Sequence, residues 1–151
     1  MAELKERLRA DLNAAMRARD QVRMRTLRLA LTSITNEEVA GASARDLTDD
    51  EVVRVLTREA RKRREAAEAF GAAGRSDQAA AERAEGEVLA GYLPAQLSDD
   101  ELAALVDAAI AETGASGPSG LGQVMKTVTP RIAGRADGAR VAAEVRRRLS
   151  G

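Results

Sequence analysis

The sequence predicts an all-α protein with a long-helix N-terminal domain and a small three-helix C-terminal domain. Good helix formers such as Ala, Arg, Glu and Leu are abundant. Residues that favour strands are sparse, and the only aromatic residues are Phe70 and Tyr92. Apolar residues also recur at helical spacing, and no segment alternates as a half-buried strand does.

The N-terminal domain is expected over residues 1–93 and begins with two amphipathic helices, over about 2–18 and 21–39. Each carries apolar residues three or four positions apart: Leu4, Leu8 and Leu12 in the first, and Met24, Leu27, Leu31 and Ile34 in the second. Arg19 and Asp20 mark the break between them.

Two more helices are expected to complete this domain. Thr48 followed by Glu51 forms a capping box, which predicts a third helix that continues to about Phe70. Ser76 is the predicted cap of a fourth helix, which has Tyr92 near its end.

Pro94 stops the fourth helix, and the C-terminal domain is expected over residues 98–151. Ser98 and Glu101 form a second capping box before an apolar run, and Gly114 suits the position after that helix. The loop 114–120 follows.

The last two helices carry the apolar residues Leu121, Val124, Met125 and Val128, and then Val141, Val145 and Leu149. Pro130 is expected to kink or end the first of them. Gly134 to Gly138 should form the turn between the two.

Composition excludes several classes of site. The chain has no Cys and no His, which excludes disulfides, thiolate nucleophiles, imidazole bases and Cys/His zinc sites. The acidic clusters at 49–51 and 99–101 follow Thr or Ser, and are interpreted as helix caps rather than metal ligands. We expect no metal, no cofactor and no catalytic residue. Because no signal peptide or membrane span is present, a cytoplasmic location is predicted.

Charge is balanced overall, with 24 basic and 24 acidic residues, but it is unevenly distributed. Residues 54–64 hold six bases and one acid, and residues 123–151 hold seven bases and two acids. Residues 98–112 hold five acids and no base. Such runs are either solvated helix faces or binding surfaces.

Three strings together resemble the GatB/YqeY family: the junction Tyr92-Leu-Pro-Ala-Gln-Leu-Ser-Asp-Asp-Glu-Leu102, then Gly122-Gln-Val-Met-Lys126, and then Gly134-Arg-Ala-Asp-Gly138. The resemblance covers essentially the whole chain. It implies kinship with the tail of the B subunit of glutamyl/aspartyl-tRNA amidotransferase, which helps to hold tRNA while the chemistry takes place elsewhere. Gln123 and Lys126 look like the tail version of the motif, whereas Arg131 and the Asp137-Gly138 ending look like the free-standing version.

Within the motif, Gly134 and Gly138 are expected to need positive φ or a close backbone approach, and Asp137 is expected to cap the last helix. Val124 and Met125 should face the core. The remaining polar residues have no evident core role, so the candidate RNA-binding residues are Gln123, Lys126, Arg131, Arg135, Arg146 and Arg147.

These observations favour a non-catalytic, tRNA-associated binding module. A protein-interaction adaptor is the first alternative, since alanine-rich helix faces suit a partner helix. An accessory role in carbon–nitrogen ligase activity with glutamine as amido donor is the second. The expected partner is accordingly tRNA or another protein, with no membrane.

Overall fold

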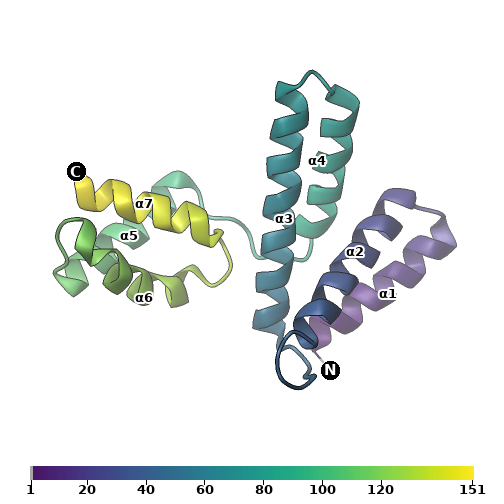
Figure 1. Cartoon of the computed structure of the whole chain (residues 1–151), viewed down its shortest axis with the longest axis horizontal. Helices are drawn as coiled ribbons and strands as arrows, with labels where there is room; N and C mark the ends of the chain where they lie inside the picture. Colours follow the sequence, from purple (N-terminus) through teal and green to yellow (C-terminus); the bar gives the residue numbers. More distant parts are fainter. Residues whose placement is uncertain (1) are drawn as a thin grey trace. The chain divides into compact units, whose positions relative to one another are not determined.

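In the computed structural model, which describes residues 2–151, the chain is built from helices joined by short loops (Figure 1). The prediction of an all-α protein is confirmed, and the described residues contain no strand. The elements are α1 (Glu3–Ala18), α2 (Gln21–Glu38), α3 (Asp49–Ala72), α4 (Ser76–Ala90), α5 (Asp99–Thr113), the 3₁₀ turn η1 (Pro118–Gly120), α6 (Leu121–Ile132) and α7 (Gly138–Ser150).

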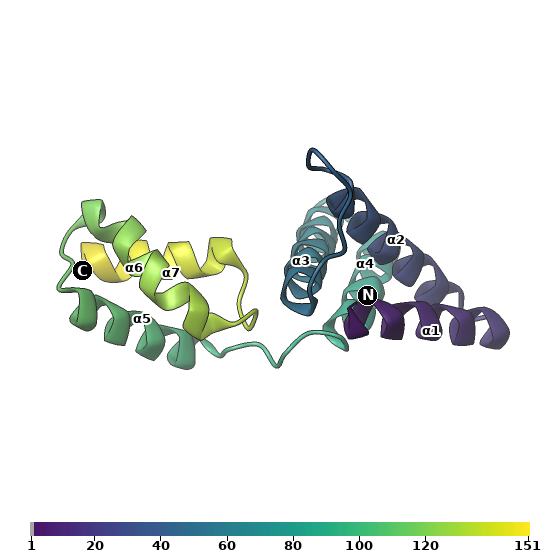
Figure 2. The same ribbon diagram turned by 90° about the horizontal axis from the view of Figure 1, so that it is seen from below.

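The chain divides into two compact units, Met1–Leu93 and Pro94–Gly151. In the first unit, α1 and α2 form one antiparallel hairpin and α3 and α4 form another (Figures 1 and 2). In the second unit, α5, α6 and α7 all pack on one another.

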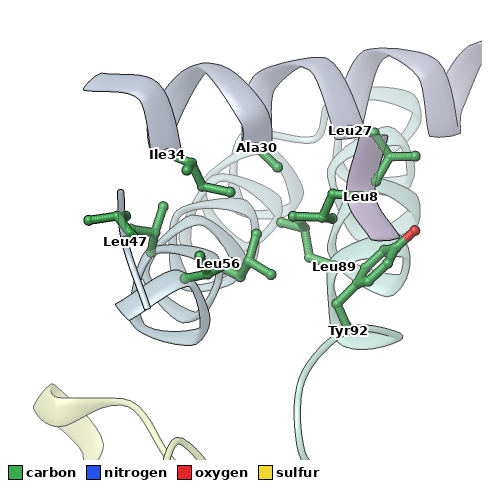
Figure 3. Packing of buried hydrophobic residues seen from close by; sticks show 10 residues of the cluster. Leu8, Leu27, Ala30, Ile34, Leu47, Leu56, Leu89 and Tyr92 are labelled. Atoms are coloured by element: carbon green, nitrogen blue, oxygen red, sulfur yellow. The ribbon is translucent and has the colours of Figure 1, made fainter. Parts of the chain in front are cut away.

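The core of the first unit is aliphatic apart from Tyr92, and all four helices contribute to it. Figure 3 shows side chains from each helix pointing into the same interior: Leu8, Leu27, Ile34, Leu56 and Leu89. Each of these side chains is almost completely removed from solvent. Removing an apolar side chain of this size from water contributes about 1.5–3 kcal/mol, so these positions hold the two hairpins together.

The core of the second unit follows the same pattern with smaller side chains. Val106 of α5, Val124 and Val128 of α6 and Val145 of α7 are all fully buried. Met125 is half-buried against this cluster. The expectation that Val124 and Met125 face inward is confirmed.

Helix starts follow the predicted capping signals at two positions. Thr48 and Ser98 each accept a hydrogen bond from the backbone N–H three residues later, and the Glu51 and Glu101 carboxylates each accept one from the backbone N–H of the cap residue. These two capping boxes fix the starts of α3 and α5.

Two local predictions did not hold in full. Ser76 is the first residue of α4 rather than its cap; the cap position is Arg75, with no side-chain hydrogen bond. Gly74, at φ 76°, reverses the chain so soon after α3 that only Arg75 remains before α4. Pro130 was expected to kink or end α6, and it does not end the helix, which continues to Ile132 because a proline in the last turn removes only one backbone hydrogen bond. No helix of the described residues is long and apolar enough to cross a membrane.

Candidate nucleic-acid interface

The first motif, Gly122 to Lys126, forms the start of α6. Gln123 and Lys126 lie three positions apart, so their side chains share one helix face. Both are exposed, whereas Val124 between them is fully buried. Because of the helical period, Val124 faces the core, whereas Gln123 and Lys126 face solvent.

The second motif forms the turn between α6 and α7. Ala133 ends α6 in the left-handed conformation at φ 51°, and Gly134 follows at φ 79°. This confirms the predicted requirement for glycine at 134. The turn is anchored to the segment before α5, because the Leu97 N–H donates to the Arg135 carbonyl at 2.8 Å.

Arg135 caps the C-terminal end of α6. Its Nε donates to the Ile132 carbonyl at 3.3 Å, and its Nη2 donates to the Arg131 carbonyl at 3.2 Å. These carbonyls lie in the last turn, where basic groups are favourable. Arg135 was chosen as a candidate because it has no evident core role, but it has a structural role at the surface as this cap, of which a single sequence gives no sign.

Asp137 and Gly138 begin α7. The Arg140 N–H donates to Asp137 Oδ1 at 2.9 Å, which confirms the predicted cap, and Asp137 is only 7% exposed. Gly138 was wrongly expected to need positive φ or a close approach. It is the first residue of α7, and a Cβ added there would meet no atom within 4 Å.

Two of the candidate arginines are already in ion pairs. Arg131 of α6 pairs with Glu112 of α5 through its Nη2. Arg147 pairs with Glu144 at 2.6 Å, and the neighbouring Arg148 reaches the same carboxylate at 3.0 Å. The hydrogen bond from Arg147 is the main reason why the pKa of Glu144 is held below its usual value.

The acidic α5 neutralises much of the basic charge of α6 and α7. Besides the Arg131–Glu112 pair, Arg140 bonds Asp99 at 2.8 Å and Arg148 reaches Asp107 at 3.4 Å. Sequence reasoning identified both charge runs but not their pairing, because the partners lie far apart in the chain and meet only after folding.

Lys126 and Arg146 differ from the other basic residues of this unit. Within its described residues, they are the two whose side chains make neither an ion pair nor a hydrogen bond, and both are exposed. Of the six candidate binding residues, Gln123, Lys126 and Arg146 are thus left with no structural partner. They lie on α6 and α7, which pack against each other.

The candidate residues Gln123, Lys126 and Arg146 present polar and charged groups to solvent. Among residues 2–151, no group of three or more carboxylates is placed to hold a metal ion. The available chemistry is hydrogen bonding and charge attraction by exposed amide, ammonium and guanidinium groups, which suits a backbone-contacting interface.

Comparison with family models matches residues 5–149 to the family described as Yqey-like protein. The match spans both units and includes the junction and both motifs. A comparison with curated proteins finds no match.

Proposed function

The chain belongs to the YqeY-like family, and on that premise we propose that its C-terminal unit is a non-catalytic, cytoplasmic module that binds folded tRNA. The observation that carries the proposal is the pair Gln123 and Lys126, two motif residues that are exposed and have no side-chain partner in the fold. A motif residue with no structural role is best explained by contact with a partner. The resemblance to the amidotransferase tail makes tRNA the expected partner.

Recognition in this proposal is of backbone and shape. The chain has one Tyr, one Phe and no Trp, and Tyr92 is buried, so no aromatic platform is available for stacking unpaired bases. Folded RNA presents phosphates and 2′-hydroxyls instead. Gln123 offers an amide that can donate and accept, and Lys126 and Arg146 offer charge.

The test is tRNA binding by the full chain as a function of salt. The double variant Lys126→Gln, Arg146→Gln removes the two cations that have no partner in this unit. It should weaken binding and reduce the magnitude of the log–log salt slope by about 2, since each phosphate contact contributes somewhat less than 1. Replacing Arg131 and Arg135 would be a poorer test, because it would break an ion pair and a helix cap.

A matched control is Arg17→Gln, Arg83→Gln, which removes the same charge from exposed sites on α1 and α4. Its binding should stay within about threefold of wild type, because long-range effects of exposed charge are screened. Equal binding by wild type and by the Lys126, Arg146 variant would refute the proposal, as would absence of tRNA binding at low salt.

A protein-interaction adaptor is the second candidate. It is favoured by three large apolar side chains that remain exposed in the first unit: Met16 at 45%, Leu29 at 43% and Val39 at 58%. Capture of the same protein partner from an RNase-treated lysate by wild type, and its loss in the variant Leu29→Ser, Val39→Ser, would favour this function. An accessory role in amide transfer predicts stimulation of a glutamine-dependent ligase, which we do not expect from the isolated chain.

A further inference from the structure

The middle of α3 carries the densest basic run of the chain, and in the folded helix some of these side chains face the core while others face solvent. Residues 54–64 contain six bases and one acid. The acid, Glu59, is turned inward and is only 5% exposed. The outward face is consequently basic along this stretch, with Arg54, Arg58, Arg61, Lys62 and Arg64.

The inward-facing charged residues of this stretch, Glu59 and Arg63, make contacts that stabilise the fold. Glu59 accepts a hydrogen bond from the Ser33 hydroxyl at 2.9 Å. Arg63 lies within 3.5 Å of Glu82 and 3.7 Å of Glu85, both on α4. These contacts join α3 to α2 and α4, and they account for the inward-facing members of the run.

Arg54, Arg58 and Arg61 form a row on the outward face. Their spacing of four and three positions places them on one side of the helix, over about 10 Å at 1.5 Å per residue. The row is defined by these three arginines. It lies in the first unit and includes none of the residues assigned to the tRNA-binding module.

The three arginines of the row make only weak ion pairs, or none, with other residues of the protein. Arg54 is exposed, with no ion pair among residues 2–151. Arg58 lies 3.5 Å from Glu37, and both side chains are more than two-fifths exposed. Arg61 lies 3.9 Å from Glu65. Exposed pairs of this kind contribute between zero and about 1 kcal/mol, so a phosphate can replace either carboxylate at little cost.

We propose that the Arg54–Arg58–Arg61 row binds the phosphate backbone of a folded RNA. Guanidinium groups match phosphate oxygens in a planar, two-point geometry. A duplex backbone requires only a row of cations, which is what this face offers. This inference concerns a surface separate from that of the proposed function and does not depend on it.

Two other anionic partners fit this face less well. Binding in a membrane surface needs an apolar helix face, and the apolar side of α3, with Val52, Val55 and Leu56, is buried in the core. The centre of a protein interface combines arginine with aromatic side chains in a well-packed, desolvated cluster. None of the five outward-facing residues of this stretch is apolar.

The test uses the full chain and a labelled RNA stem-loop, with a DNA stem-loop of the same sequence as a second probe. The triple variant Arg54→Gln, Arg58→Gln, Arg61→Gln should bind the RNA at least about tenfold more weakly at moderate salt, with the salt slope reduced in magnitude by about 2 to 3. The scattered control Arg17→Gln, Arg28→Gln, Arg83→Gln loses the same charge and should stay within about threefold of wild type. Circular dichroism of both variants should match wild type, because all of the replaced side chains point away from the core.

The outcomes separate this inference from the proposed function. If the α3 triple variant binds RNA more weakly while the Lys126, Arg146 variant binds normally, the result supports RNA binding by the arginine row. The same result contradicts the proposed tRNA-binding role of the second unit. Normal RNA binding by the α3 triple variant, with weaker binding by the Lys126, Arg146 variant, overturns the proposal for the row. Equal losses in the α3 variant and the scattered control overturn it too, since net charge alone would then explain binding. Tighter binding of the DNA probe than of the RNA probe would reassign the row to another partner and overturn it as an RNA site.

Discussion

Tyr92 joins α1 and α2 through its hydroxyl at the end of the first unit. The hydroxyl donates to Asp11 Oδ2 at 2.5 Å and accepts from Arg23 Nη2 at 3.2 Å. The Arg7 guanidinium carbon lies 4.6 Å from the centre of the ring. Burial of the phenol, followed by the hydrogen bond to Asp11, raises the pKa of Tyr92 to about 12.

This raised pKa gives the first prediction. Tyr92 is the only tyrosine and the chain has no Trp, so ultraviolet absorbance reports on this single phenol. Its titration midpoint should lie near 12 rather than at the ordinary 10.0. Because the folded pKa exceeds the unfolded one, the associated stability is complete below pH 10 and is lost as pH rises towards 12. The variant Asp11→Asn should lower the midpoint, and a wild-type midpoint at the ordinary value would contradict this account.

The second prediction concerns the buried ion pair between Lys5 of α1 and Glu38 at the end of α2. The Lys5 Nζ lies 2.8 Å from both Glu38 oxygens, and the residues are 5% and 9% exposed. Removal of one partner leaves a charge with little water around it, so Lys5→Met should reduce the free energy of unfolding by at least about 2 kcal/mol. The double variant Lys5→Met, Glu38→Leu should regain most of that loss. Urea unfolding measures both changes.

Acid supplies an independent check on the same pair. The hydrogen bond from Lys5 is the main reason why the pKa of Glu38 lies below its ordinary 4.5. The stability from this shift is therefore present above pH 4.5 and is lost as pH falls through the lowered pKa. The double variant lacks both charges, so its stability should fall less steeply than that of wild type in this acid range. Equal slopes would contradict the assignment.

Local roles of single residues were predictable from the sequence, and distant partners were not. Thr48, Ser98 and Asp137 were identified as caps because a capping hydrogen bond spans only three positions. The contacts of Lys5 with Glu38 and of Tyr92 with Asp11 span 33 and 81 positions. Nothing in one sequence indicates which of many charged residues will meet across a core.

At the scale of elements, the helices follow apolar periodicity, and errors concentrate where they end. Most helix ends were anticipated within a few residues. The cap of α4, however, is Arg75 rather than Ser76, and α6 ends after Ile132 rather than at Pro130. Both errors arise because a residue type permits a helix boundary without requiring one. The residue at which the helix starts or ends depends on the position of the neighbouring turn, and here those turns are at Gly74 and at Ala133–Gly134.

The end of α6 gives the third prediction. Ala133 occupies the left-handed region at φ 51°, where a Cβ is unfavourable by about 1–2 kcal/mol. Ala133→Gly should remove this strain, less the entropy cost of a more flexible unfolded chain, and should stabilise the second unit by about 0.5–1 kcal/mol. The side chain is exposed, so no packing is lost. Thermal unfolding measures the change; a loss of stability would show that the turn is not strained. Ala139→Gly, in the first turn of α7, is the control and should be neutral or destabilising.

At the scale of the whole molecule, the sequence predicts two independently folding parts, and the structure divides at Leu93/Pro94. Each unit has its own hydrophobic core. In the second unit, the acidic α5 and the basic α6 and α7 complement each other, which explains why opposite charge runs occur within one small domain. The candidate site was less predictable, because the charges left for a partner are known only after the internal pairs have formed.

The fourth prediction is that limited proteolysis separates these parts. A protease needs several residues in an extended, locally unfolded conformation, which helices held in a core do not offer. Ala95 and Gln96 are exposed and lie outside any helix, between α4 and α5 and close to the division at Leu93/Pro94. The loop 114–120 is the next candidate, although Gly120 packs closely on Ala115 there. Elastase at a low ratio should therefore cut first after Ala95.

The fragments test independent folding directly. The segment after the cut retains α5, α6 and α7 and their shared core, so it should keep a helical circular-dichroism spectrum and unfold cooperatively. Its size of fewer than 60 residues is near the limit for a single core without disulfides or metals, so we expect a lower melting temperature than that of the first unit. First cleavage within residues 52–68 would contradict the division, because that stretch of α3 contributes Val52, Val55 and Leu56 to the larger core. A C-terminal fragment without helical signal would show that the second unit depends on the first for its folding.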